Sequence, residues 1–163
     1  MKATLIIEGK EIEIEISKEE YKKLHPSETG YERVPENSEF YYEYSRGGVE
    51  CSIDEYCNID NKYYESANYY SSDIIAENNA RADKLMRQLR RFAVEHRGHG
   101  VNLNDINTAK FYIYYDNELE SGSVFGAKFF GAICFDSEET ARAAIDEFYD
   151  ELIWYFNEYK DSL

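Results

Sequence analysis

The stretch Ser72–Gly98, SDIIAENNARADKLMRQLRRFAVEHRG, decides how this chain folds. Ser72 is a residue type that caps helix N-termini, Asp73 suits the positive end of a helix dipole, and Gly98 favours a helix stop. At about 100° per residue, the apolar residues between them fall within one arc of the helix. These residues are Ile75, Ala82, Leu85, Met86, Leu89, Phe92 and Ala93. The pattern predicts an amphipathic helix of about 25 residues that forms the spine of the core.

The opposite face of this helix is cationic. Six of the eighteen Lys and Arg residues lie between positions 81 and 97, although the formal net charge of the chain is −15. Four of them lie opposite the apolar arc: Lys84, Arg87, Arg90 and Arg91. Three interpretations are open for this basic face: ion pairing within the chain or simple solvation, binding of a protein, and contact with nucleic acid. The acidity of the whole chain opposes the third, because a polyanion is repelled at long range.

Alternating residues before the long helix predict hairpins. Ala3–Ile7 and Glu11–Ile16 flank a turn, and the second run alternates isoleucine with glutamate as a half-buried strand does. Ser17 and Glu20 match a capping box, so a short helix is expected to begin there and to end near Leu24.

A second hairpin is expected to pair Glu39–Tyr44 with Val49–Ile53 across a glycine-containing turn. The polar, tyrosine-rich residues 54–71 are interpreted as an irregular connection that is partly packed through its rings.

The residues after the long helix predict further strands at Phe111–Tyr115, Val124–Phe125 and Ala132–Phe135, separated by turn-forming and glycine-rich segments. Asp136 and Glu139 form a second capping box, which is expected to open a C-terminal helix that continues or restarts towards the end of the chain. The expected fold class is therefore α+β. Mostly antiparallel strands, as N-terminal hairpins and a C-terminal meander, would pack on the long helix and the C-terminal helix.

Length and composition bound the organisation of the chain. Its 163 residues, 43% of them hydrophobic and 16% aromatic, suffice for one compact domain, with sub-units expected at 1–70 and 71–163. The sequence has no apolar run of membrane-spanning length and no signal-peptide pattern, so a soluble intracellular protein, located in the cytoplasm, is expected. Cys51, Cys57 and Cys134 are expected to be free thiols, although a bridge between the first two is left open.

No motif predicts catalysis, a metal site or a bound cofactor. No family-type signature joins a cysteine to His25, His96 or His99, and no metal-binding motif surrounds the two histidines near the helix end. The sequence also lacks the glycine-rich patterns that hold nucleotide phosphates. We therefore expect a protein without enzymatic activity.

Acidic and aromatic residues occur together in two segments, and such surfaces can imitate DNA. Carboxylates supply charge in place of phosphates, while tyrosines supply rigid contact area. The first segment contributes Tyr112, Tyr114, Asp116, Glu118 and Glu120, and the C-terminal helix contributes Glu147, Asp150 and Glu151. These eight residues are the predicted partner-binding surface, although a merely solubilising acidic surface is the competing interpretation.

Two parts of the chain resemble small proteins carried by phages and prophages of Gram-positive bacteria. One is Thr29–Val34 together with Tyr63–His96, and the other is Phe111–Phe156, with FYIYYDNELE and ICFDSEETARAAIDEF. The resemblance implies an accessory protein of a mobile element, a class in which acidic inhibitors of CRISPR nucleases and other defence proteins are common. It implies no functional residue.

The leading hypothesis is a non-enzymatic phage accessory protein that inhibits a host or defence protein, such as a CRISPR nuclease, by nucleic-acid mimicry. Under this hypothesis, the protein is expected to bind neither a membrane nor nucleic acid directly. An alternative is that the protein is a sponge that binds a nucleotide signal. Arg87, Arg90 or Arg91 would then hold the phosphate of the nucleotide. Another is a phage regulatory protein that self-assembles into a homo-oligomer.

Overall fold

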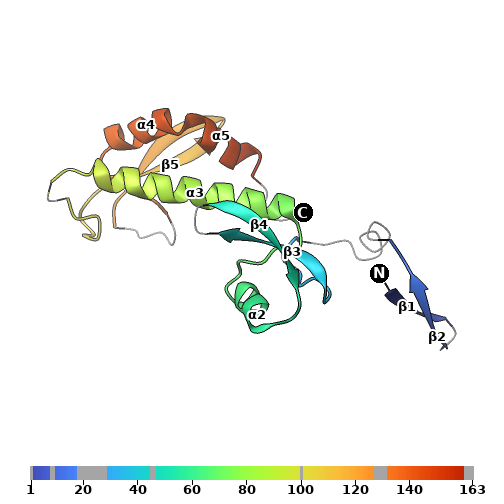
Figure 1. The fold of residues 1–163 in the computed structure, drawn as a ribbon. Coiled ribbons are helices and arrows are strands. Elements are labelled where there is room, and N and C mark those ends of the chain that lie inside the picture. The colour runs from blue at the N-terminus through green and yellow to red at the C-terminus, as the bar shows by residue number, and fades with distance from the viewer. Residues whose placement is uncertain are drawn as a thin grey trace. The chain divides into compact units, whose positions relative to one another are not determined.

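A computed structural model describes six stretches of the chain, shown as a ribbon in Figure 1: residues 2–7, 10–17, 29–44, 47–99, 101–126 and 132–159. The described residues form two compact units. Unit 1 draws on Met1–Tyr42 and Glu50–Ala76, and unit 2 draws on Glu43–Val49 and Glu77–Asp161. Each unit is described by itself.

The fold is α+β with antiparallel strand pairs, which confirms the expected class. The strands are β1 (Lys2–Ile7), β2 (Lys10–Glu15), β3 (Ser38–Tyr44), β4 (Gly48–Asp54), β5 (Lys110–Asp116) and β6 (Glu118–Val124). The helices are α2 (Asn58–Glu65), α3 (Asp73–Glu95), α4 (Glu138–Glu147) and α5 (Tyr149–Asn157).

The first predicted hairpin is present. β1 pairs antiparallel with β2, from Lys2 opposite Glu15 to Ile7 opposite Lys10. The short helix expected between Ser17 and Leu24 lies outside the described residues.

Unit 1 has an aromatic core. β3 and β4 form a two-stranded sheet, and an isolated bridge joins Tyr41 of β3 to Tyr70. Phe40 is fully buried and stacks on Tyr69, with ring centroids 4.4 Å apart. Burial of such large rings gives this small sheet the apolar contact area that a two-stranded hairpin alone lacks.

Residues 54–71 are not the irregular connection that was expected, because they contain α2. Cys57 caps this helix: its backbone N–H donates to the Asp60 carboxylate, while its side chain accepts from the Asp60 backbone. This reciprocal pair is a capping box with cysteine in place of the usual serine or threonine. A sequence pattern that requires serine or threonine at the cap does not detect it.

The long helix agrees closely with its prediction. α3 begins at Asp73, next to the capping hydroxyl of Ser72, and its 23 residues end at Glu95. The predicted apolar positions are buried except for Met86, which is half-buried. Amphipathic periodicity thus identified both the helix and its inward face.

The strands of unit 2 differ from their predicted positions. β5 pairs antiparallel with β6, which begins immediately after the turn at Asn117 instead of at Val124. The strand expected at Ala132–Phe135 is reduced to one bridge between Phe135 and Phe111. The second half of the chain therefore contains a hairpin with one added bridge, and the expected meander is not formed among the described residues.

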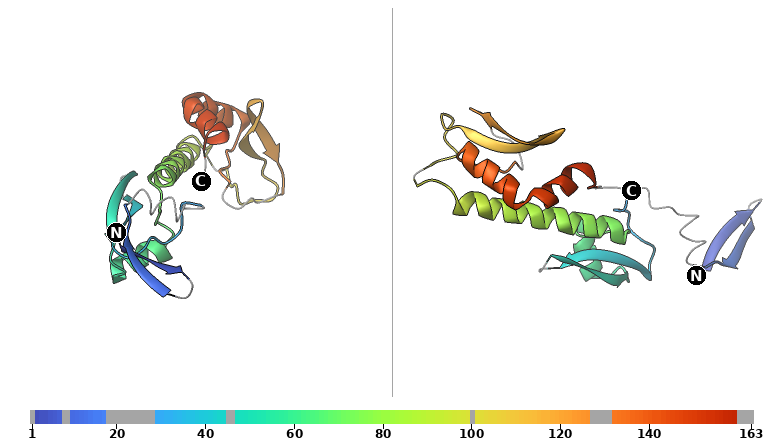
Figure 2. Two further views of the ribbon diagram at one scale, coloured as in Figure 1. Left: turned by 90° about the vertical axis from the view of Figure 1, so that its right-hand side faces the viewer. Right: turned by 90° about the horizontal axis from the view of Figure 1, so that it is seen from above.

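α4 and α5 follow one another with a break at Phe148. The side chain of Ser137, one residue after the predicted cap, accepts a hydrogen bond from the Thr140 backbone and so begins α4. Both helices lie beside α3 in the two views of Figure 2. Leu85, Leu89, Phe92, Phe135, Ala144, Ile145 and Leu152 form the shared core, with Phe111, Ile113 and Leu119 of the hairpin against it.

Among the residues that the structure describes, no helix has both the length and the apolar composition needed to cross a membrane. The three cysteines are free thiols, of which Cys51 and Cys57 are exposed.

Candidate functional site

The β5–β6 hairpin gathers five of the predicted partner-binding residues on one face. Its register places Tyr112 opposite Gly122, Tyr114 opposite Glu120, and Asp116 opposite Glu118. Directly paired residues point to the same side of a sheet, and alternate residues along a strand do so too. Ile113 and Leu119, which alternate with these residues, pack against the core. We call the outward set Tyr112, Tyr114, Asp116, Glu118 and Glu120 the acidic hairpin face.

Gly122 shapes this face by making room for Tyr112. A Cβ atom at Gly122 would lie 2.8 Å from the Tyr112 ring, closer than side chains approach one another. The Tyr112 ring therefore lies across the backbone of β6. The ring of Tyr114 is its neighbour, with centroids 6.0 Å apart. The outward side of the hairpin thus combines two neighbouring aromatic rings with the carboxylates of its tip.

Tyr114 and Glu120 are coupled. The Tyr114 hydroxyl donates a hydrogen bond to the Glu120 carboxylate across the strand pair. This bond raises the pKa of Tyr114 above its ordinary value, because removing the phenol proton would place a second negative charge beside the carboxylate. Glu120 also acts on Arg142, whose pKa is raised chiefly by its own bond to Glu138.

The tip of the face carries the least compensated charge. Asp116, Glu118 and Glu120 are all exposed. Asp116 accepts a hydrogen bond from the Asn117 side chain, 3.2 Å away. Within the described part of the chain, the Glu118 side chain makes no hydrogen bond and no ion pair. A cation that approaches the hairpin tip therefore finds two carboxylates, Asp116 and Glu118, that no basic side chain of the described residues neutralises.

The other end of the hairpin is closed. Lys110 begins β5 and is buried, and its ammonium group donates to the backbone carbonyls of Asp105 and Thr108. A further backbone bond joins Gly126 to Ile106. These bonds tie the loop that contains Asp105, Ile106 and Thr108 to the first residues of β5 and to the end of the segment that follows β6.

The three predicted residues of the C-terminal helix lie elsewhere in unit 2. Glu147, Asp150 and Glu151 line a pocket of about 500 Å³ between α3 and the junction of α4 with α5. Arg81 and Lys84 of α3 line it from the other side. The structure therefore divides the predicted surface into the acidic hairpin face and this pocket. Among the described residues, basic side chains of α3 line the pocket and are not found at the acidic hairpin face.

Arg81 organises this pocket, and sequence reasoning had not assigned it to the site. Its guanidinium forms two hydrogen bonds with Glu151, at 2.8 and 3.2 Å, and lies over the ring of Trp154 at 4.0 Å. The partners are far apart in the sequence, so no local pattern reveals the contact. Glu151 is consequently a paired carboxylate, whereas the side chains of Glu147 and Asp150 make no hydrogen bond or ion pair with the described residues and are exposed.

The four predicted residues of the basic face have different environments. Arg87 bonds to Glu43 of β3 at 2.8 Å and lies 3.9 Å from Asp83. Arg91 lies 3.9 Å from Glu95, a separation that contributes little at an exposed site. Lys84 faces the pocket, and Arg90 is exposed without an ion pair to any described residue. These residues do not form one uniform cationic surface.

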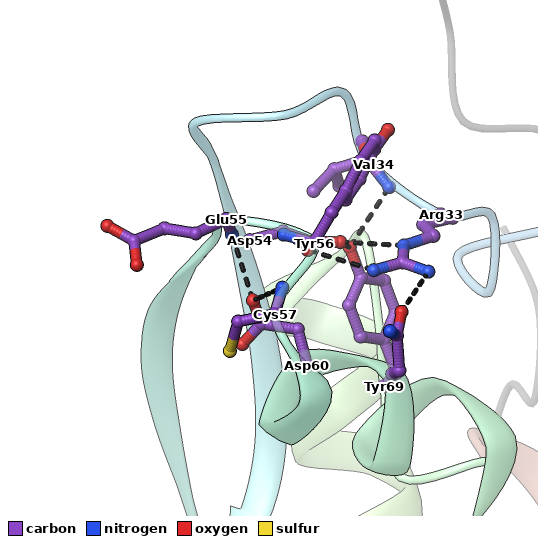
Figure 3. Close-up of polar contacts among 9 residues, drawn as sticks. Arg33, Val34, Asp54, Glu55, Tyr56, Cys57, Asp60 and Tyr69 are labelled. Atoms are coloured by element: carbon purple, nitrogen blue, oxygen red, sulfur yellow. Dashed lines mark hydrogen bonds and ion pairs between the residues drawn. The ribbon is translucent and has the colours of Figure 1, made fainter.

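Unit 1 contains a buried polar cluster, shown in Figure 3. The Asp54 carboxylate is completely buried and accepts bonds from the Arg33 guanidinium, the Tyr69 hydroxyl and the Tyr56 backbone. Burial alone raises the pKa of Asp54, but these hydrogen bonds outweigh it and hold that pKa below its ordinary value. Arg33 also donates to Asn61. Because each partner is hydrogen-bonded, the cluster is suited to holding the segment that carries Arg33 against β4 and α2.

No three His, Cys, Asp or Glu side chains in the described ranges come together as metal ligands. Comparisons with protein-family models, with curated proteins and with solved structures gave no match to this chain.

Proposed function

We propose that this protein is a non-enzymatic inhibitor that docks its acidic hairpin face on the cationic, nucleic-acid-binding surface of a host or defence protein. A CRISPR nuclease is the target class that we favour, because the resemblance to phage accessory proteins points to it. The inhibitor would act by mimicry, occupying a channel that otherwise holds DNA or RNA.

One observation carries the proposal: strand register places two tyrosines and three carboxylates on a single outward face. A sheet face with half-buried rings and exposed carboxylates suits docking against another surface, whereas substrates are usually enclosed in pockets. The tyrosine rings supply rigid contact area at low entropic cost. The carboxylates supply the charge that steers a basic partner towards the face.

The spacing of the charges is compatible with mimicry. Alternate residues of a strand lie about 7 Å apart and directly paired residues about 5 Å apart. Asp116 and Glu118 are such a direct pair, and Glu120 is two residues farther along β6. These separations are of the same order as the spacing of nucleic-acid phosphates, of which each strand carries one per 3.4 Å of helix axis, roughly.

Charges around the pocket do not favour a nucleotide sponge. Four carboxylates line the pocket, those of Asp146, Glu147, Asp150 and Glu151, against two cationic side chains. Arg81 is already bonded to Glu151, and none of the three arginines expected to hold phosphate lines the pocket. A phosphate group would therefore be repelled there more than attracted.

The test is competition with DNA. A purified CRISPR nuclease loaded with its guide RNA is titrated with this protein while the binding of a fluorescent target duplex is measured by anisotropy, at low and high salt. The proposal expects DNA binding to fall as the protein is added, with inhibition that weakens as salt screens the contact.

The same competition is then run with the nucleic-acid-binding proteins that a tagged form of the chain captures from a Gram-positive lysate. Simultaneous binding of DNA and this protein, for the nuclease and for every captured protein, would contradict mimicry.

A further inference from the structure

Two arginines of this chain are bound in the same way. Arg33 donates from Nε and one terminal nitrogen to both oxygens of Asp54, at 2.9 and 3.1 Å, and lies over the Tyr56 ring at 4.3 Å. Arg81 donates to both oxygens of Glu151 and lies over the Trp154 ring at 4.0 Å. Each guanidinium is thus forked to a carboxylate and stacked on an aromatic ring.

This arrangement selects arginine over lysine for a geometric reason. A guanidinium is planar and presents parallel N–H groups, so it can fork to a carboxylate while its flat side rests on a ring. An ammonium group is a compact, strongly hydrated point charge that has no planar fork. The two internal pairs therefore show which combination of groups holds arginine in this chain.

The acidic hairpin face has the same combination without an arginine. Tyr114 and Asp116 are two residues apart on one strand, so their side chains share the outward side, and Glu118 lies directly opposite Asp116. Asp54 and Tyr56, which hold Arg33, are likewise close in the sequence, at the end of β4 and just beyond it. The hairpin tip thus offers a ring and two carboxylates at neighbouring positions.

The charged groups around this position leave it anionic. Glu120 already accepts the Tyr114 hydroxyl, and it lies within the electrostatic range of Arg142. The guanidinium of Arg142 is itself bonded to Glu138 at 2.8 Å. Asp116 and Glu118 remain as the exposed acceptors beside the Tyr114 ring.

We propose that the acidic hairpin face binds arginine side chains of its partner in preference to lysine, with the guanidinium stacked on Tyr114 and forked to Glu118 or Asp116. This inference rests on the proposed function and narrows its partner to a surface rich in arginine. A partner whose channel is lined mainly by lysine would be bound less tightly at the same charge.

The test compares two peptides with the whole protein. An oligo-arginine and an oligo-lysine peptide of equal length and charge are titrated at low salt, and their dissociation constants are measured by calorimetry. We expect the arginine peptide to bind about tenfold more tightly, which a forked and stacked contact can supply. Tyr114→Leu should reduce this ratio to near one by weakening the arginine peptide alone.

Controls separate stacking from charge and from misfolding. Tyr114→Phe keeps the ring and should keep the preference, whereas Tyr149→Leu removes an exposed ring at the pocket and should leave the ratio unchanged. Asp116→Asn combined with Glu118→Gln changes two exposed positions. This double variant should bind both peptides more weakly, with the larger loss of affinity for the arginine peptide. Circular dichroism checks that each variant is folded.

The outcomes distinguish this inference from the proposed function. Equal affinity for the two peptides, or a preference that persists in folded Tyr114→Leu, overturns the arginine inference and leaves the DNA competition unaffected. Binding of neither peptide also overturns it. Loss of competition with DNA instead overturns the proposed function, whatever the peptides show.

Discussion

Tyr114 donates its phenol hydrogen to Glu120, the residue directly opposite it across the β5–β6 hairpin. This bond joins an aromatic ring to a carboxylate on the surface that we propose to be functional. It also determines which carboxylates can bind a partner. The Glu120 carboxylate already accepts a hydrogen bond from Tyr114, whereas the Glu118 carboxylate accepts none from the described residues. The chemistry of the face therefore depends on strand register as well as on composition.

Replacing Glu120 should change the titration of Tyr114. Its pKa is raised by the hydrogen bond to Glu120, so Glu120→Gln should lower that pKa towards the ordinary value of about 10. A raised folded-state pKa stabilises the fold below the unfolded pKa, and the contribution is lost as the pH rises through the folded value. Nuclear magnetic resonance of selectively labelled Tyr114 measures the titration directly. Glu118→Gln removes the same charge without the bond, and an equal shift in both variants would contradict the coupling.

Filling the space at Gly122 should disturb Tyr112. Gly122→Ala places a Cβ where the tip of the Tyr112 ring now lies, so the ring must turn away from β6 and we expect the free energy of unfolding of unit 2 to fall by about 1 kcal/mol. Fluorescence of the only tryptophan, Trp154, reports unfolding of this unit in urea. In a Tyr112→Ala background the same substitution should cost clearly less, and an unchanged cost would show that the ring is not the obstacle. Ser123→Ala, at an exposed position of β6, serves as the control.

Replacing Arg81 with lysine should lower the stability of unit 2 slightly, although the positive charge is retained. Arg81→Lys loses the fork to Glu151 and the flat contact with Trp154. Both members of the ion pair are about two-fifths exposed, with side-chain exposures of 44% and 41%, so solvent screens the pair. We therefore expect a loss of only about 1 kcal/mol in urea unfolding followed by Trp154. Arg90→Lys, at a position without a described ion pair, should change stability by less, and equal effects would argue against the contact.

The buried Asp54 should make unit 1 sensitive to acid. Because its folded-state pKa lies below the unfolded value of about 3.9, its contribution is present above that pH and is lost as the pH falls through the folded pKa. Asp54→Asn leaves Arg33 without its carboxylate and should destabilise unit 1 by about 3 kcal/mol near neutral pH. Hydrogen exchange of unit 1 amides measures this loss.

The difference between wild type and Asp54→Asn should shrink as the pH falls below about 4. Glu55→Gln, an exposed neighbour, provides the control and should show no such convergence. A gap that stays constant with pH would contradict the assignment of this acid sensitivity to Asp54.

Local patterns predicted the features that depend on local physics. Helix α3 was predictable because its cap, its charge at the N-terminus and its apolar period agree, and its buried face followed from them. The five residues of the hairpin were recognised from composition. Composition did not show that these residues share a face, because that depends on the register between β5 and β6. The sequence of β6, ELESGSV, has weak strand propensity, and its pairing with β5 holds it as a strand.

The remaining features depend on contacts between distant residues. The pocket joins Arg81 of α3 to Glu151 and Trp154 of α5, and Asp54 meets Arg33 and Tyr69, so no sequence window contains these partners. Helix α2 was missed for a different reason. Its cysteine cap imitates a serine or threonine capping box, and the tyrosines around it resemble a packed loop.

The measurement that tests the central claim most directly is inhibition by a hairpin-neutralised variant. Asp116→Asn, Glu118→Gln and Glu120→Gln together remove three exposed charges from the acidic hairpin face. Glu36→Gln, Glu65→Gln and Glu77→Gln remove three exposed charges elsewhere and match the change in net charge. The protein bound by the wild-type chain in the DNA competition is the common target.

We predict that the hairpin variant inhibits DNA binding at least about tenfold less well than wild type, whereas the matched variant stays within about twofold of it. Equal inhibition by the two variants would show that net charge, and not the acidic hairpin face, is responsible for binding.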